Sequence, residues 1–255
     1  MDMFFGIETG ATLALALFIG FSAGVIKGVV GFAMPMVMVS GLATIASAEV
    51  AIAGMILPTL VTNLWQALRQ GPRAAWASIL RFRAFLLTGG AIMLLSAQLV
   101  PWLPGQLLLL FLGISITLFV LLQILGIRIR LSSGARSRAE PVFGAIAGFF
   151  GGLSGIWGPP TVAMLTAMNT EKAEQIRVQG VIYGLGSLVL VVAHLGSGVL
   201  RAETLPLTAS LVPPALLGMA LGFKLHDRFD QETFRKVTLF VLLFGGLNLV
   251  RRGLV

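Results

Sequence analysis

The sequence predicts an all-α integral membrane protein made of two inverted repeats, each a broken or re-entrant helical segment followed by three transmembrane helices. Three observations lead to this prediction. Of the 255 residues, 57% are hydrophobic and only 11% are charged, against about 25% charged in an ordinary soluble domain. The apolar sequence divides into runs of about 20 residues, the length that crosses a bilayer. Two of these runs are interrupted by glycine and proline at corresponding places in the two halves of the chain.

The first half opens with nearly continuous apolar sequence from Thr9 to Leu68, which is too long for two simple spans. Lys27 and the turn-like sequence GVVGFAMP at 28–35 interrupt it. One span each follows at Ala84–Val100 and at Leu107–Ile127. We therefore expect a broken segment first and three spans after it.

The second half opens with an apolar stretch at 141–169 that is broken at 155–160, in the sequence GIWGPP. Proline removes a backbone donor and fixes φ, so one helix is expected to stop before it and another to start at it. The second piece is too short to cross a bilayer, so a re-entrant hairpin is expected, with a single bent helix as the alternative. Three spans follow, the last of them short: Val178–Leu200, Leu205–Phe223 and Val237–Val250.

The polar sequence between the halves predicts the domain organisation. Residues 126–140 carry four arginines and a Ser/Gly-rich centre, which is typical of a linker. We expect a first transmembrane repeat at 1–125, a basic cytoplasmic linker at 126–140 and a second repeat at 141–255. The broken segments also match each other, because glycines 24, 28 and 31 align with glycines 151, 155 and 158.

The distribution of basic residues favours inverted halves. If each broken segment returns to the side it entered, fourteen of the 18 Lys and Arg residues fall in cytoplasmic loops. Only Arg201, Arg251 and Arg252 then lie outside, with Lys27 in the membrane. If the broken segments instead cross the membrane once each, eleven basic residues lie in cytoplasmic loops and six lie outside. Because cytoplasmic loops carry the excess of Lys and Arg, the first topology is preferred.

Composition also excludes several function classes. The net charge of +8 comes from short clusters between apolar runs, so it indicates membrane topology and no nucleic-acid partner. There is no cysteine and no HExxH motif, and all three aspartates lie outside the predicted spans. A hydrolase would have to combine His194 with a serine such as Ser154, and nothing in the sequence fixes their geometry. We expect neither an enzyme nor a metal site or cofactor.

The two interrupted segments are the pattern expected of a secondary transporter. Where a helix starts inside the bilayer, its free N–H groups and its partial positive charge favour an anion. Backbone N–H groups near Gly31–Ala33 and Gly158–Thr161 are therefore the expected principal ligands. Lys27 adjoins the first break, and a charged lysine at the centre of a span costs roughly 2.5–3.5 kcal/mol. It either supplies positive charge to an anionic substrate, or snorkels to the surface or pairs with Glu49 or Glu8.

Other residues at membrane depth have two interpretations each. Asn63 and Gln66 share one helical face, as do Gln179 and Tyr183, so each pair could line a pathway or tie helices together. His194 is either a proton carrier or a structural donor. The glycines repeating every four residues at 20, 24 and 28 and at 144, 148 and 152 indicate close helix packing. Trp157 either walls the second break or anchors packing.

Two sequences carry a family resemblance: GFSAGVIKGVVGFAMPMVMV from Gly20 and GAIAGFFGGLSGIWGPPTVAML from Gly144. They resemble the paired glycine-rich motifs of the sulfite exporter TauE/SafE family of bacterial inner-membrane transporters. Phe32-Ala33-Met34 replaces the further glycines common in the first motif. The resemblance implies transport of small anions, usually sulfur-containing ones such as sulfite or organosulfonates, often as export.

The sequence therefore predicts a secondary transporter of small anions in a bacterial inner membrane, with an anion channel or a non-transporting membrane subunit as alternatives. The substrate would sit where the two breaks approach each other. The coupling ion, a proton or sodium, and a homodimer are left open. The expected substrate-binding residues are Lys27, Gly31, Phe32, Ala33, Asn63, Gln66, Trp157, Gly158, Pro159, Pro160, Thr161, Gln179 and Tyr183.

Overall fold

A computed structural model describes residues 9–31, 33–68, 71–126, 136–168, 170, 172–226 and 231–255. These residues form helices and no β-strand, as the sequence predicts. In chain order the helices are α1 (Gly10–Val30), α2 (Met34–Leu42), α3 (Ala48–Leu68), α4 (Pro72–Arg81), α5 (Arg83–Ala97), the 3₁₀ helix η1 (Val100–Trp102), α6 (Gly105–Ile124), α7 (Arg136–Ser154), α8 (Gly158–Ala167), α9 (Lys172–Ser197), α10 (Leu205–Ser210), α11 (Val212–His226) and α12 (Gln231–Leu254).

Six stretches of the described chain are long and apolar enough to cross a membrane. They are Gly10–Val29, Ala48–Leu68, Arg83–Trp102, Gly105–Ile124, Val178–Ser197 and Leu205–Leu225. The chain is therefore a multi-pass membrane protein. The predicted last span lies in α12, several of whose side chains (231–235, 237, 238 and 241) lie outside the described residues, and it is not among the six. That helix is also much longer than the short span expected at Val237–Val250.

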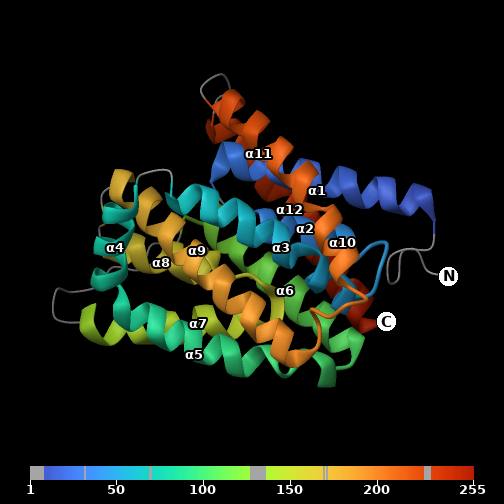
Figure 1. The fold of residues 1–255 in the computed structure, drawn as a ribbon, viewed down its shortest axis with the longest axis horizontal. Helices are drawn as coiled ribbons and strands as arrows, with labels where there is room; N and C mark the ends of the chain where they lie inside the picture. The colour runs from blue at the N-terminus through green and yellow to red at the C-terminus, as the bar shows by residue number, and fades with distance from the viewer. Residues whose placement is uncertain are drawn as a thin grey trace.

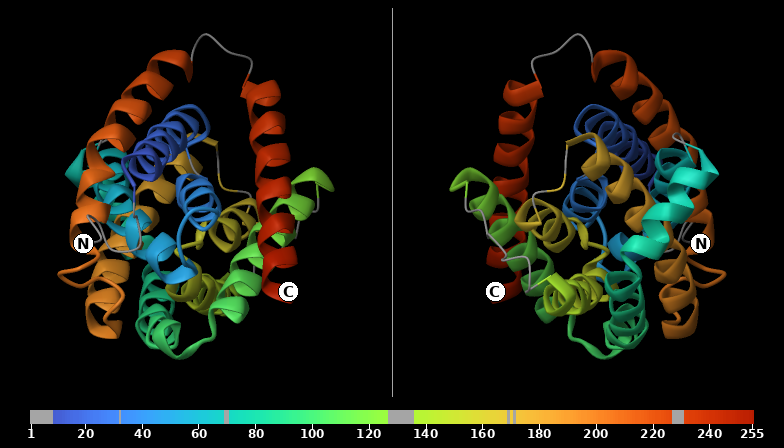
Figure 2. Two further views of the ribbon diagram at one scale, coloured as in Figure 1. Left: turned by 90° about the vertical axis from the view of Figure 1, so that its right-hand side faces the viewer. Right: turned by 90° about the vertical axis from the view of Figure 1, so that its left-hand side faces the viewer.

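The first break lies where the sequence predicts it. Gly31 ends α1 in the left-handed region (φ 84°), and its N–H donates to the Lys27 carbonyl over 2.7 Å. Pro35 stands in the first turn of α2, where its missing N–H costs nothing. Phe32, between them, lies outside the described residues. α2 is only nine residues long and buries three methionines among the longer helices that surround it (Figure 2).

The second break also lies in the predicted sequence, but the helices around it have different bounds. Gly155 takes a positive φ of 69° and ends the helical run of α7. α8 begins at Gly158, with prolines in its first turn, two residues before the predicted start at Pro160. α7 begins at Arg136, inside the predicted linker, and carries Pro141 within it. The linker's residues 127–135 lie outside the described part of the chain.

At both breaks the chain turns back on itself (Figure 1). α1 and α3 both begin on the right-hand side of the view, so α2 returns the chain to the side from which α1 started. α7 and α9 both begin on the left-hand side, so α8 does the same from the opposite side. α12 ends on the side where α1 begins.

Close helix packing at the glycine repeats is confirmed. A Cβ on Gly24 would lie 2.2 Å from the Ala215 carbonyl oxygen, so α1 and α11 touch backbone to backbone. A Cβ on Gly148 would lie 2.2 Å from the Gly89 carbonyl oxygen, which brings α7 equally close to α5. These two helix pairs form the upper and lower edges of the molecule in Figure 1.

A proline inside α3 creates a contact between the halves. Pro58 has no N–H, so the Gly54 carbonyl loses its helical partner. The Thr208 hydroxyl of α10 donates to that carbonyl and accepts the Leu57 N–H, both over 3.1 Å. Unsatisfied backbone groups are costly at membrane depth, and Thr208 removes this cost.

Two features of the fold differ from the predicted spans. Residues 72–81 form the separate helix α4, where we expected only a loop. The predicted single span at Leu205–Phe223 is interrupted at Leu211, between α10 and α11. Pro213 and Pro214 follow the interruption directly and cannot donate to the carbonyls four residues before them.

Candidate functional site

The two breaks lie against each other in the middle of the molecule, and a small cavity of about 30 Å³ separates them. Six of the residues that line it belong to the set expected from the sequence: Lys27, Ala33, Asn63, Trp157, Gly158 and Tyr183. Four others were not expected: Pro35, Met36, Gly155 and Ile156. These four flank the predicted break residues in sequence, which is the signal that could have found them.

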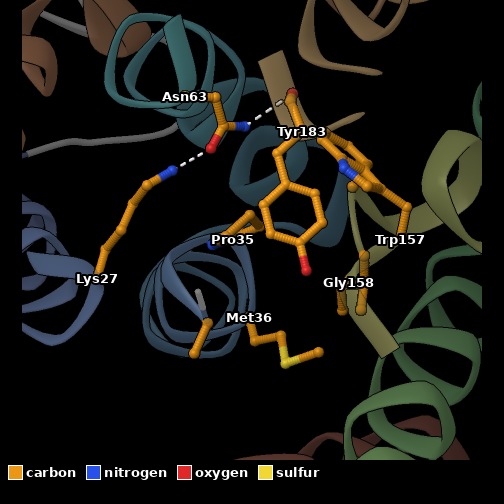
Figure 3. A pocket seen from close by; sticks show the side chains of 10 residues that line it. Lys27, Pro35, Met36, Asn63, Trp157, Gly158 and Tyr183 are labelled. Atoms are coloured by element: carbon orange, nitrogen blue, oxygen red, sulfur yellow. Dashed lines mark hydrogen bonds between the residues drawn. The ribbon is translucent and has the colours of Figure 1, made fainter. Parts of the chain in front are cut away.

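Lys27 is the charged residue of this cavity. Its side chain is 2% exposed, and its ammonium donates a hydrogen bond to the amide oxygen of Asn63 on α3 (Figure 3). Among the described residues, no carboxylate lies within ion-pair distance of the Lys27 ammonium. Glu49, one of the partners considered for it, pairs instead with Arg201 at 2.6 Å. Glu8 lies outside the described residues. Lys27 therefore does not snorkel, because it ends inside the protein at a neutral partner.

Asn63 joins Lys27 to the second half of the chain. Its amide nitrogen donates to the Tyr183 carbonyl oxygen on α9 over 3.1 Å. The amide oxygen faces Lys27 and the amide nitrogen faces α9, so both ends of this buried side chain are occupied (Figure 3). The bonds run from α1 through α3 to α9.

The Tyr183 hydroxyl is a buried donor that no other described residue uses. The side chain is 4% exposed, and Figure 3 shows its ring pointing between Met36 of α2 and Gly158 of α8. A Cβ on Gly158 would lie 3.4 Å from the hydroxyl oxygen, so Gly158 keeps this approach open. A buried hydroxyl normally has a hydrogen-bond partner, so this one is available to bond to a water molecule or a ligand.

Ala33, Pro35 and Met36, at the start of α2, line the cavity. No side chain caps this helix, whose N-cap residue Ala33 has a left-handed φ of 75°. The first N–H groups of a helix have no partner within it, and Pro35 has none to offer. This leaves the N–H groups of Met34 and Met36 at the helix start.

The start of α8 supplies fewer donors than expected. Pro159 and Pro160 have no N–H, and the Thr161 N–H donates to the Trp157 carbonyl over 3.4 Å. Of the backbone N–H donors expected at Gly158–Thr161, only that of Gly158 therefore remains available. The N–H of Ile156, two residues before Gly158, donates to the Ser154 hydroxyl oxygen over 3.3 Å.

Trp157 both walls the break and anchors packing. Its indole lies between α7 and α9, since Cβ atoms placed on Gly151 and on Gly186 would lie 3.3 and 3.2 Å from it. The same side chain lines the central cavity. A Cβ at either glycine would crowd the ring, which would have to shift by a few tenths of an ångström.

The remaining expected residues do not line this cavity. The Thr161 hydroxyl donates to the Trp157 carbonyl over 2.8 Å and so serves its own helix. Gln66 is half-buried, and its amide oxygen has no partner among the described residues. Gly31, Pro160 and Gln179 are half-buried outside the cavity wall. Pro159 is the second residue of α8, and Phe32 lies outside the described residues.

This arrangement suits binding of a small anion. One ammonium, one hydroxyl and the starts of two helices face the cavity, and these are donors. No group of three or more potential metal ligands occurs among the described residues. His194 contacts the hydroxyl of Ser197 at 3.2 Å.

The comparisons with known proteins agree with the sequence motifs. A family model described as "Sulfite exporter TauE/SafE" matches residues 16–249, nearly the whole chain. No curated protein and no solved structure matches the chain significantly.

Proposed function

The chain belongs to the sulfite exporter TauE/SafE family, and from that premise we propose that it exports sulfite or a small organosulfonate across a bacterial inner membrane. Members of this family are membrane transporters and not enzymes. The substrate binds in the cavity between the two helix breaks. Lys27 provides the charge, and the Tyr183 hydroxyl and the N–H groups at the start of α2 and at Gly158 provide hydrogen bonds.

The observation that carries this proposal is the buried ammonium of Lys27. It has a neutral amide as its partner, and no described carboxylate compensates its charge. A buried charge without a counter-charge is expensive, so an anion in the cavity would stabilise the protein by supplying one. The partnerless hydroxyl of Tyr183 lines the same cavity and adds a donor for that anion.

The size of the cavity supports transport by alternating access. About 30 Å³ corresponds to roughly two probe spheres the size of water. The cavity is thus too small to hold a four-atom sulfite ion unless the breaks move apart. We propose that one half of the chain rocks against the other, so that the breaks open to each side in turn.

The packing of the helices supports two inverted repeats as the moving halves. We propose 1–125 and 141–255 as the repeats, with 126–140 as a basic cytoplasmic linker. If the two halves are equivalent, α1 of the first half corresponds to α7 of the second, and α5 corresponds to α11. The α1–α11 contact then has the α7–α5 contact as its counterpart. Both contacts are close glycine packings. The α3–α9 and α6–α12 contacts map onto themselves under the same correspondence. The energy would come from the substrate gradient or from a proton or sodium gradient.

Flux measurements with the purified protein test the proposal. Vesicles containing the protein and loaded with labelled sulfite should release it with saturable kinetics, and an organosulfonate such as sulfoacetate should compete. Protein-free vesicles give the leak, and acetate tests whether the sulfur oxyanion is preferred. Release that does not saturate would indicate a channel. Release no faster than the leak, from protein shown to be folded, would contradict the proposal.

A further inference from the structure

A second and larger cavity lies outside the central site, between α5, α7 and α9. Its volume is about 340 Å³, and among the described residues Arg83 is the only charged one that lines it. The other lining side chains are apolar, and several positions are glycines. Leu87 and Leu188, on its walls, are 72% and 42% exposed, so the cavity is a groove that opens on the surface facing lipid.

The groove has the depth of one bilayer leaflet. Its wall on α5 runs from Arg83 to Met93, and the ten helical steps between these residues span about 15 Å at 1.5 Å per residue. Half of a hydrocarbon core about 30 Å thick is the same length. Met93 marks the deep end, where it and the Trp157 ring both lie within 3.3 Å of the Cβ position of Gly151.

The shallow end of the groove has the chemistry of a membrane interface. Arg83 is exposed and forms no ion pair with a carboxylate of the described residues. The neighbouring helix α4 contributes Ile79 to the groove and exposes Trp76, at 62%, on its outer side. Exposed tryptophans mark the level of the lipid headgroups, and an arginine there binds phosphate.

We propose that this groove is a binding site for an anionic phospholipid, with the lipid phosphate on Arg83 and one acyl chain lying along α5 as far as Trp157. The apolar walls match the acyl chain, the length matches one leaflet and the charge matches the headgroup. Because Trp157 also lines the central cavity, the bound chain packs against a wall of the substrate site. The site is independent of which anion the protein carries.

Quenching of Trp157 fluorescence by brominated lipids tests the proposal. A variant with Trp65→Phe, Trp76→Phe and Trp102→Phe keeps Trp157 as its one tryptophan. Bromine quenches tryptophan at short range, and Trp157 is only 4% exposed. In vesicles of phosphatidylglycerol brominated at mid-chain, we expect strong quenching relative to unbrominated vesicles. Absence of quenching would overturn the proposal, because a chain in the groove must touch Trp157.

Filling the groove supplies the matched control. Gly90 lines the groove, and the nearest atom to a Cβ there is a Val189 methyl at 3.8 Å, so Gly90→Phe would occupy the space. This variant, or Val189→Phe from the facing helix, should lose the quenching while retaining the thermal unfolding profile. Leu94→Phe, on the lipid-facing surface of α5 outside the groove, should keep it. Quenching that persists after Gly90→Phe and Val189→Phe would overturn the acyl-chain site.

The headgroup is tested separately. Brominated phosphatidylglycerol as a minor component of phosphatidylcholine vesicles should quench Trp157 more than the same fraction of brominated phosphatidylcholine. In Arg83→Gln the two lipids should quench equally, because the phosphate no longer meets a cation that favours the anionic lipid. An unchanged preference in Arg83→Gln would overturn the role of Arg83, and no preference in the parent would overturn the choice of an anionic lipid.

Discussion

The ammonium of Lys27 on α1 bonds to the amide oxygen of Asn63 on α3, and both residues line the cavity between the two helix breaks. Since Asn63 is neutral, it satisfies one donor of the ammonium and none of its charge. The proposed anion site requires such an uncompensated charge, which a structural ion pair would not leave.

Lys27→Met is expected to weaken anion binding and leave the fold intact. Removing a hydrogen bond to a charged group costs about 1.5–3 kcal/mol, which lowers affinity roughly 10- to 100-fold. The lost donor leaves the Asn63 amide oxygen without a partner, but removing a buried charge offsets that cost. Thermal unfolding with and without sulfite measures both effects. Lys224→Met, at an exposed position on α11, is the control and should keep the sulfite-induced shift.

Tyr183→Phe should change stability and binding in opposite directions. The hydroxyl has no partner within the described structure, so its removal relieves an unsatisfied buried group and should stabilise the unliganded protein by about 1 kcal/mol. The same change removes a donor from the anion, and sulfite affinity should fall about tenfold or more. Calorimetry of sulfite binding, together with unfolding of the free protein, separates the two. A variant with unchanged affinity would show that the hydroxyl does not meet the substrate.

Local chemistry made the breaks predictable. Gly31 and Gly155 take positive φ values, and proline follows within a few residues in each case. The glycine that permits a positive φ and the proline that begins a new helix are both visible in the sequence. The ends of α1 and α7 therefore lie where glycine and proline indicate. The same reasoning failed at α7's start, because Pro141 is tolerated inside that helix. It also missed α4, whose charged ends resemble a loop.

Long-range contacts could not be predicted. Asn63 and Tyr183 are 120 residues apart in the chain, and their hydrogen bond depends on how α3 packs against α9. Helical spacing in the sequence groups Asn63 with Gln66 and Tyr183 with Gln179. The two glutamines do not line the cavity. Spacing along a helix identifies a shared face, but only packing decides which member of the pair reaches the cavity.

Thr208→Val should destabilise the protein by about 1–3 kcal/mol, the cost of leaving a buried backbone group unsatisfied. Valine keeps the shape of threonine but cannot donate to the Gly54 carbonyl that Pro58 leaves without a helical partner. Thr208→Ser retains the hydroxyl and should lose much less stability. Thermal unfolding of both variants in the same detergent gives the comparison. An equal loss of stability in the valine and serine variants would mean that the methyl group of Thr208 stabilises the protein and its hydrogen bonds do not.

Gly148→Ala and Gly90→Ala should have opposite effects, although both replace a helical glycine in the same region. Alanine is favoured over glycine in a helix by up to about 1 kcal/mol, so Gly90→Ala should stabilise slightly, its Cβ meeting nothing closer than 3.8 Å. At Gly148 the added Cβ would lie 2.2 Å from the Gly89 carbonyl oxygen. Separating α7 from α5 to make room should cost about 1–3 kcal/mol, as in an overpacked core. Because α7 leads into the second break, we expect Gly148→Ala also to slow sulfite release from vesicles. Thermal unfolding and sulfite flux of the two variants, measured side by side, test both expectations. A Gly148→Ala protein as stable as the Gly90→Ala protein would contradict backbone contact between α5 and α7.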